Sequence, residues 1–354
     1  MKNQLRIGVY LSYVNLAISS IIPFLYTPIM LDMLGQAEYG LYSLANSVVG
    51  YLSLLSFGFG GTIVRYISKY RAENNINEVE KTYGFFLVLY CCLSIVVLIG
   101  GCIISNNVEL MFSNGLLSSE LAKMKTLVVI MSISTAISFP LSVFTSLTTA
   151  YEKYFFRKIL DIVATLFVPI SNLIALYLGY ASIGLAISGT IIQLLIGSFN
   201  ITYCFKKMGL RPRFSILPKK MVCEMLGFSV FVFIASIVDM LFWATDKVIL
   251  GIFANTIAVA IYNIGVTFNN MVMTLSTSIS GVLVPKITGM VVTNTDKKEW
   301  TNLFIKVGRI QFLIIALDKR SAEYCTPSSF KDSSNPSVQV ARISPDSSLI
   351  FMSV

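Results

Sequence analysis

The sequence contains no histidine, and only 13% of its 354 residues are charged. The lack of imidazole excludes His-dependent catalytic triads, His-ligated metal sites and the commonest proton shuttle. The sequence also lacks a glycine-rich phosphate loop and an acidic motif for metal-bound diphosphate. We therefore predict a protein that is not an enzyme, with no catalytic residues, no bound metal and no cofactor.

The low charge also argues against a water-soluble domain. Soluble domains carry about 25% charged residues, whereas 55% of this chain is hydrophobic. The six cysteines show no metal-ligand spacing, and most lie in apolar segments, where they behave as small hydrophobic residues. The net charge of +9 is better explained by basic cytoplasmic loops than by nucleic-acid binding. The composition thus predicts an integral membrane protein with no nucleic-acid partner.

Long apolar runs give the secondary structure, because a helix needs about 20 apolar residues to cross a bilayer. The first run is longer than the h-region of a cleaved signal peptide, so we expect it to be retained as a helix. Eight transmembrane helices are predicted: Ile7–Leu31, Leu41–Val64, Tyr83–Ser105, Thr126–Ala150, Ile159–Leu178, Ser182–Phe205, Gly227–Phe253 and Ile257–Val284.

The basic residues predict the orientation of these helices. The connections after the second, fourth, sixth and eighth helices contain nearly all the loop lysines and arginines, among them Arg65–Lys81 and Lys206–Lys220. The opposite connections offer only Lys123, Lys125 and, near a helix end, Lys247. Since basic residues collect on the cytoplasmic side, the N-terminus is predicted to be cytoplasmic in a multi-pass membrane protein. The Arg65–Lys81 connection is predicted to form an amphipathic surface helix.

The fold predicted is all-α, a polytopic transmembrane bundle of two lobes with an incomplete second lobe. A faint repeat, Leu-Gly followed by a helix that begins with Tyr, occurs at equivalent places in the two halves, as in transporters built from related lobes. We expect a six-helix lobe at 1–205, a basic linker at 206–226, a partial second lobe at 227–317 and a disordered Ser/Pro-rich tail at 318–354. Near Ala316 the composition changes from apolar to Ser- and Pro-rich. We interpret the residues that follow as foreign read-through, and a short functional tail is the alternative.

Polar residues inside the membrane are the candidate functional groups, because burying them in hydrocarbon is costly. Asp239, Trp243, Asp246 and Lys247 are spaced to share one helix face, which suits a water-filled cavity. Alternatively, Asp246 and Lys247 mark the membrane interface, and Asp239 pairs with a neighbouring helix.

Arg65 and Asn263 are the remaining candidates. Arg65 ends the second predicted helix, where it faces either a cavity mouth or lipid phosphate, and a snorkelling surface role is the alternative. Asn263 is an embedded amide that serves either a ligand or an interhelical hydrogen bond.

Two stretches resemble the bacterial polysaccharide-biosynthesis export family, the O-antigen and capsule-repeat-unit flippases of the multidrug/oligosaccharidyl-lipid/polysaccharide superfamily. They are LDMLGQAEYGLYSLANSVVGYLSLLSFGFGGTIVRYISKYRAE (Leu31–Glu73) and TDKVILGIFANTIAVAIYNIG (Thr245–Gly265), within a likeness covering about Leu5 to Ala316. Family members have twelve to fourteen helices in two lobes around a central cavity. This chain supplies the first lobe and the start of the second, which makes an inactive truncated product one alternative.

The resemblance implies a flippase that carries an undecaprenyl-diphosphate-linked oligosaccharide to the outer face of the cytoplasmic membrane. It implies that Arg65, Lys247, Trp243 and Asn263 contact the substrate, and that Asp239 and Asp246 couple an ion. The partners expected are the lipid-linked oligosaccharide, membrane lipid, and the polysaccharide polymerase and glycosyltransferases. A drug/cation antiporter of the same superfamily is the alternative function, although the first four helices contain almost no acidic residues.

Overall fold

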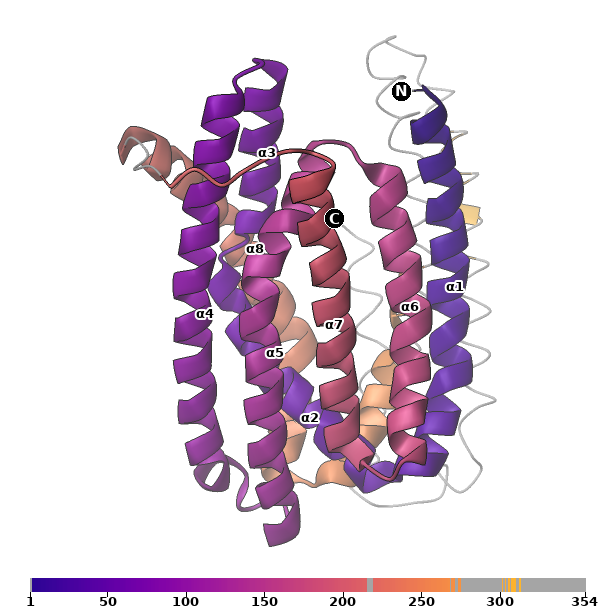
Figure 1. Ribbon diagram of the computed structural model, residues 1–354. Coiled ribbons are helices and arrows are strands. Elements are labelled where there is room, and N and C mark those ends of the chain that lie inside the picture. The colour runs from indigo at the N-terminus through magenta and orange to yellow at the C-terminus, as the bar shows by residue number, and fades with distance from the viewer. Residues whose placement is uncertain are drawn as a thin grey trace. The chain divides into compact units, whose positions relative to one another are not determined.

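The structure is a computed structural model that describes residues 2–214 and 219–267, together with a few isolated positions up to 312. The chain divides into two compact units, Met1–Ile261 and Tyr262–Val354. The first unit contains almost all the described residues. Its described residues form helices and short connections, with no strand among them (Figure 1).

Seven helical segments of this structure are long and apolar enough to cross a membrane, which confirms the all-α membrane fold. They match the first seven predicted spans, and most extend beyond the predicted ends because charged and polar residues continue the helices outside the apolar core. The helices are α1 (Lys2–Leu34), α2 (Gln36–Ser53), η1 (Leu54–Ser56), α3 (Phe59–Ala72), α4 (Ile76–Phe112), α5 (Ser118–Ala150), α6 (Tyr154–Tyr177), α7 (Ala181–Lys206) and α8 (Lys219–Phe253).

The second predicted span differs from the expectation. Instead of one helix over Leu41–Val64, the chain forms α2, the 3₁₀ turn η1 and α3, with an interruption at Phe57 and Gly58. The surface helix predicted after Arg65 is also wrong, because α3 continues to Ala72 and α4 begins only four residues later. The Arg65–Lys81 region is therefore a tight helical hairpin. Its amphipathic pattern reflects the two helix ends that form it.

The connections gather at two opposite ends of the bundle. The basic end, as we name it, contains the connections around residues 73–75, 151–153 and 207–214. At this end the Arg71 guanidinium donates to the Ala150 carbonyl oxygen (2.9 Å), lies over the Tyr151 ring (5.2 Å) and pairs with Glu152 (3.7 Å). Burial raises the pKa of Tyr151, and the positive charge of Arg71 opposes that rise. This cluster fastens the end of α3 to the end of α5.

The connection between α7 and α8 also lies at the basic end and is attached to α4. The Arg213 backbone N–H donates to the Glu80 carbonyl oxygen (3.0 Å), and its guanidinium donates to Asn77 (2.7 Å). The Arg213 carbonyl lies so close to Gly84 that a side chain there would collide with it. Because α8 begins at Lys219, the connection is shorter than the linker predicted at 206–226.

The other end, which we call the hairpin end, contains the connections at Gly35, 113–117, 178–180 and 254–255. Glu38 accepts hydrogen bonds from Lys123 and from the Ser182 hydroxyl, which joins the beginnings of α2, α5 and α7. The alternation of connections between two ends agrees with a chain that crosses the membrane repeatedly.

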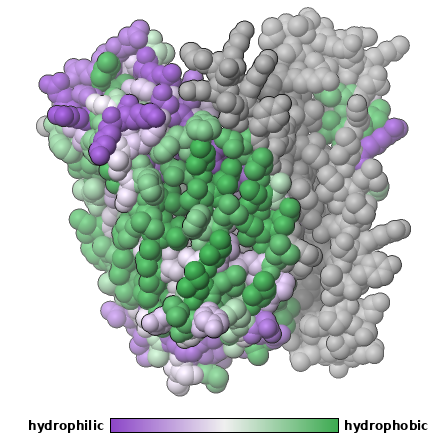
Figure 2. Space-filling model, turned by 45° about the vertical axis from the view of Figure 1, so that its right-hand side comes forward, coloured by the Kyte–Doolittle hydropathy of each residue, from purple (hydrophilic) through white to green (hydrophobic). Residues whose placement is uncertain are grey.

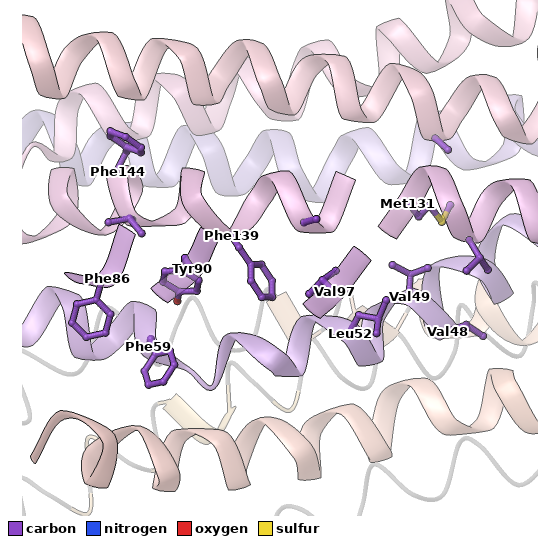
Figure 3. Close-up of a cluster of buried hydrophobic side chains, with 14 of the residues drawn as sticks. Val48, Val49, Leu52, Phe59, Phe86, Tyr90, Val97, Met131, Phe139 and Phe144 are labelled. Atoms are coloured by element: carbon purple, nitrogen blue, oxygen red, sulfur yellow. The ribbon is translucent and has the colours of Figure 1, made fainter. Parts of the chain in front are cut away.

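Aromatic and aliphatic side chains from α2, α3, α4 and α5 form the core of this unit. Figure 3 shows Phe59, Phe86, Tyr90 and Phe139 among them, and the Tyr90 and Phe139 rings meet edge to face at 5.6 Å. The large apolar side chains of the outward faces remain exposed, as the hydrophobic band of Figure 2 shows. Such a surface is stable next to lipid, where exposing apolar groups carries no cost.

The remaining predictions concern residues after Ile261. A short apolar helix begins at Thr256 and is described as far as Thr267, which corresponds to the start of the eighth predicted span. The tail predicted at 318–354 lies outside the described residues, the last of which are isolated helical positions between 301 and 312. The division into lobes stays a prediction, since the first compact unit includes α8.

Candidate functional site along helix α8

Helix α8 lies against α2, η1 and α3, and we call this contact the seam. Its contacting residues recur at helical spacing, from Met225 and Ser229 near the basic end to Met240 and Gly251 toward the hairpin end. The seam is thus one face of α8 over its whole length. It joins the helix predicted to open the second lobe to the broken helix of the first.

Arg65 lies at the basic end of the seam. Its guanidinium carbon is 4.7 Å from the centre of the Phe228 ring, a cation–π contact between α3 and α8. Next to it, the buried hydroxyls of Thr62 and Ser229 are hydrogen-bonded at 2.6 Å. Arg65 is exposed, and no carboxylate of the described residues pairs with it. The guanidinium is therefore positioned by an aromatic ring and remains available to an anion.

The interruption of α2–α3 lies further along the seam. Phe57 (φ 48°) and Gly58 (φ 65°) both adopt the left-handed conformation, which ends one helix and starts the next. The Phe57 ring contacts the Phe233 ring of α8 at 4.7 Å, and Val232 occupies the space where a Gly58 side chain would lie. Sequence reasoning missed this break, although three glycines within Gly58–Gly61 were a signal for it.

Trp243, Thr245 and Lys247 belong to the part of α8 that approaches the hairpin end. The Thr245 hydroxyl is hydrogen-bonded to the Tyr51 hydroxyl of α2 at 2.8 Å, and Trp243 packs edge to face on Phe242 at 5.0 Å. Trp243 and Lys247 are both half-buried. This segment thus presents an aromatic ring and a cation next to a hydroxyl pair.

Asp239 and Asp246 are exposed, unlike Trp243 and Lys247. The four residues predicted on one face are therefore divided between two environments, with the carboxylates in the more exposed one. No ion pair joins Asp239 to another residue of the described structure. The predicted pairing of Asp239 with a neighbouring helix finds no support in this part of the chain.

The family is decided by comparison with known proteins. A family model described as "Polysaccharide biosynthesis protein" matches residues 6–291. The chain belongs to this family. No protein of curated function is similar enough to count as a relative.

Solved structures of transporters share the fold of this polysaccharide-biosynthesis protein. The MATE multidrug transporter DinF-BH, solved in complex with R6G, has a TM-score of 0.57 at 13% identity over 88% of this chain and 68% of that one. An inward-facing multidrug resistance MATE transporter of the MOP superfamily gives 0.56 at 16% identity (86% and 72%). A MOP superfamily transporter from Pyrococcus furiosus gives 0.57 at 13% identity (94% and 75%). These likenesses confirm a membrane transporter fold.

In this family member the two cationic candidates do not form one site. Lys247 follows Phe228, the partner of Arg65, by 19 residues on α8, which corresponds to about 28 Å along a helix. Arg65 and Lys247 therefore lie near opposite ends of the seam. Asn263 belongs to the second unit, where it is half-buried and its carbonyl oxygen accepts from the Thr267 hydroxyl at 2.8 Å. Its predicted role stays a prediction.

Proposed function

We propose that this protein is a flippase that moves an undecaprenyl-diphosphate-linked oligosaccharide, an O-antigen or capsule repeat unit, across the cytoplasmic membrane. The exposed guanidinium of Arg65 carries the proposal, because it lies where α3 meets α8 and has no carboxylate partner among the described residues. Diphosphate suits this group, since a guanidinium binds phosphate oxygens with strong and often bidentate hydrogen bonds.

The basic end is proposed to face the cytoplasm, with the N-terminus on the same side of the inner membrane. Lysines and arginines of the α3–α4, α5–α6 and α7–α8 connections lie at this end, as the distribution of charge in membrane proteins requires. Arg65 would then meet the substrate where it is made. Glycosyltransferases would supply the lipid-linked unit, and a polymerase would consume it after export.

The separation of the cations suggests successive contacts with the moving headgroup. Arg65 binds the diphosphate near the cytoplasmic face, and Lys247 binds it about 28 Å further along the seam before release. Trp243 and Asn263 contact the sugar, which offers apolar faces to a ring and hydroxyls to an amide. Asp239 and Asp246 couple the movement to a cation.

A drug/cation antiporter is the second candidate function, and the exposed carboxylate of Asp239 favours it. Against it, every acidic residue of the first six spans lies near a helix end, and Asp161, the furthest from an end, pairs with Arg157 (3.3 Å) and Lys158 (3.7 Å). Described residues 2–206 therefore offer an antiported cation no carboxylate at mid-depth.

Complementation separates the two functions. A strain that lacks its own copy of this protein is expected to lose surface polysaccharide and accumulate the lipid-linked unit, and expression of this chain is expected to restore export. Polysaccharide immunoblots and drug-susceptibility assays are measured side by side. If the deleted strain keeps its surface polysaccharide but becomes more susceptible to drugs, the flippase proposal is wrong and the antiporter is supported.

A further inference from the structure

At the hairpin end, the last turn of α8 and the first residue of the helix that follows it contact other parts of the chain backbone to backbone. A Cβ atom on Gly40 of α2 would overlap the Thr256 carbonyl oxygen, and one on Gly115 would overlap the Gly251 carbonyl oxygen. Gly251 itself lies under the Leu44 side chain. Glycine at these positions allows an approach that no other residue permits.

A side-chain hydrogen bond accompanies this contact. The Thr256 hydroxyl donates to Glu120 Oε1 at 2.8 Å, while Glu120 Oε2 accepts the Leu117 N–H at the start of α5. Glu120 is thus held by its own helix and binds one group from beyond α8. The close backbone approach and this hydrogen bond together hold the contact closed.

The opposite end of the seam is built differently. There the contact depends on side chains, namely the Arg65–Phe228 pair and the Thr62–Ser229 hydrogen bond. Side chains change rotamer as a surface separates, so this end can part gradually. A contact between two backbones has no side chain that can adjust, so it is lost as soon as the segments separate.

We propose that Gly40, Gly115, Glu120, Gly251 and Thr256 form the outer gate of the translocation path, a closed backbone contact that must open to release the headgroup. Lys247 lies one helical turn before Gly251 on the same face, so the last cation of the path is immediately behind the gate. The inference rests on the proposed function for its direction, from inside to outside.

A disulfide across the gate tests the need for opening. In a background with the native cysteines replaced by serine, E120C/T256C joins the two hydrogen-bonded positions, and S134C/Q193C is the matched control within the first lobe, where the Ser134 hydroxyl donates to Gln193 at 2.8 Å. Oxidation is expected to stop polysaccharide export only in the gate pair, and reduction is expected to restore it. Continued export with the gate cross-linked would overturn the proposal.

A labelling assay tests the gate independently of the substrate. Ala244 is buried on α8, about 10 Å before Gly251 along the helix. Gly115→Ala is expected to raise the rate at which an impermeant maleimide added outside labels A244C by about tenfold, because the added methyl prevents closure. Gly189→Ala is the control, since nothing lies within 4 Å of its Cβ position.

The two assays distinguish a failure of the gate proposal from a failure of the proposed flippase function. If export is absent even without cross-linking, the proposed flippase function is wrong, and the labelling of A244C still decides the gate. Equal labelling of A244C with and without Gly115→Ala would show that this contact does not control access.

Discussion

At the residue scale, Arg65 gives the most direct prediction. Arg65→Ala is expected to lower polysaccharide export about tenfold or more, because a charge-assisted hydrogen bond to phosphate contributes about 1.5–3 kcal/mol. Arg65→Lys is expected to retain part of the activity, since lysine keeps the charge and loses the bidentate geometry. Export is measured as surface polysaccharide normalised to membrane protein content.

Lys125→Ala is the control for Arg65. Lys125 is also a surface cation but pairs with Glu109 of α4 at 2.7 Å, so its loss should leave export unchanged. An equal fall in both variants would indicate a general effect of surface charge and contradict substrate binding by Arg65.

The candidate residues show how far single positions can be read from a sequence. The charge and membrane depth of Arg65 were sufficient to select it. The sequence could not show that Phe228 lies under its guanidinium, because that contact joins residues 163 positions apart. Helical spacing grouped Asp239 with Lys247, but the structure exposes one and half-buries the other. Spacing of four or eight residues places side chains on a broad face, whereas burial depends on which helix covers it.

At the element scale, the break in α2–η1–α3 leads to a prediction of how a methyl group added at Gly58 affects stability. Gly58→Ala is expected to lower the thermal stability of the purified protein, because alanine costs about 1–2 kcal/mol in the left-handed conformation and would also collide with Val232. A change of this size corresponds to a loss of roughly 2–4 °C per kcal/mol in Tm. Tm is measured in detergent with a thiol-independent fluorescence assay.

Gly61→Ala is the matched variant three residues later. Gly61 lies inside α3 with nothing within 4 Å of its Cβ position, so alanine should be neutral or stabilising there. If Gly58→Ala were as stable as Gly61→Ala, the left-handed break between η1 and α3 would not exist in the folded protein.

The apolar runs predicted the seven described spans because a membrane helix must be apolar over a fixed length. They could not reveal the break at Phe57 and Gly58, since an interrupted helix and a continuous one need the same apolar composition. The amphipathic pattern after Arg65 likewise fits both a surface helix and two adjoining helix ends. Only the packing of α3 on α5, through Arg71 and the Ala150 carbonyl oxygen, decides between them.

At the scale of the whole molecule, the loop charges predicted that alternate connections would gather at the same end. Ion pairs and hydrogen bonds between distant segments now place them there, as Arg213 with Asn77 and Glu38 with Ser182 illustrate. The sequence could not predict that α8 would pack along α2, η1 and α3, because one face of a transmembrane helix is as apolar as another. The small residues and hydroxyls of α8 can be assigned to the seam only once the helices that pack against α8 are known.

The orientation of the bundle is the last prediction, and impermeant labelling in intact cells tests it. In a cysteine-free background, S119C at the hairpin end is expected to react from outside, whereas K207C at the basic end should react only after the cells are permeabilised; both native residues are exposed. Retention of the basic connections in the cytoplasm follows from the cost of moving their charges across the membrane. If K207C were labelled in intact cells, the bundle would have the opposite orientation to the one proposed. The direction from Arg65 toward Lys247, on which the export mechanism depends, would then be reversed as well.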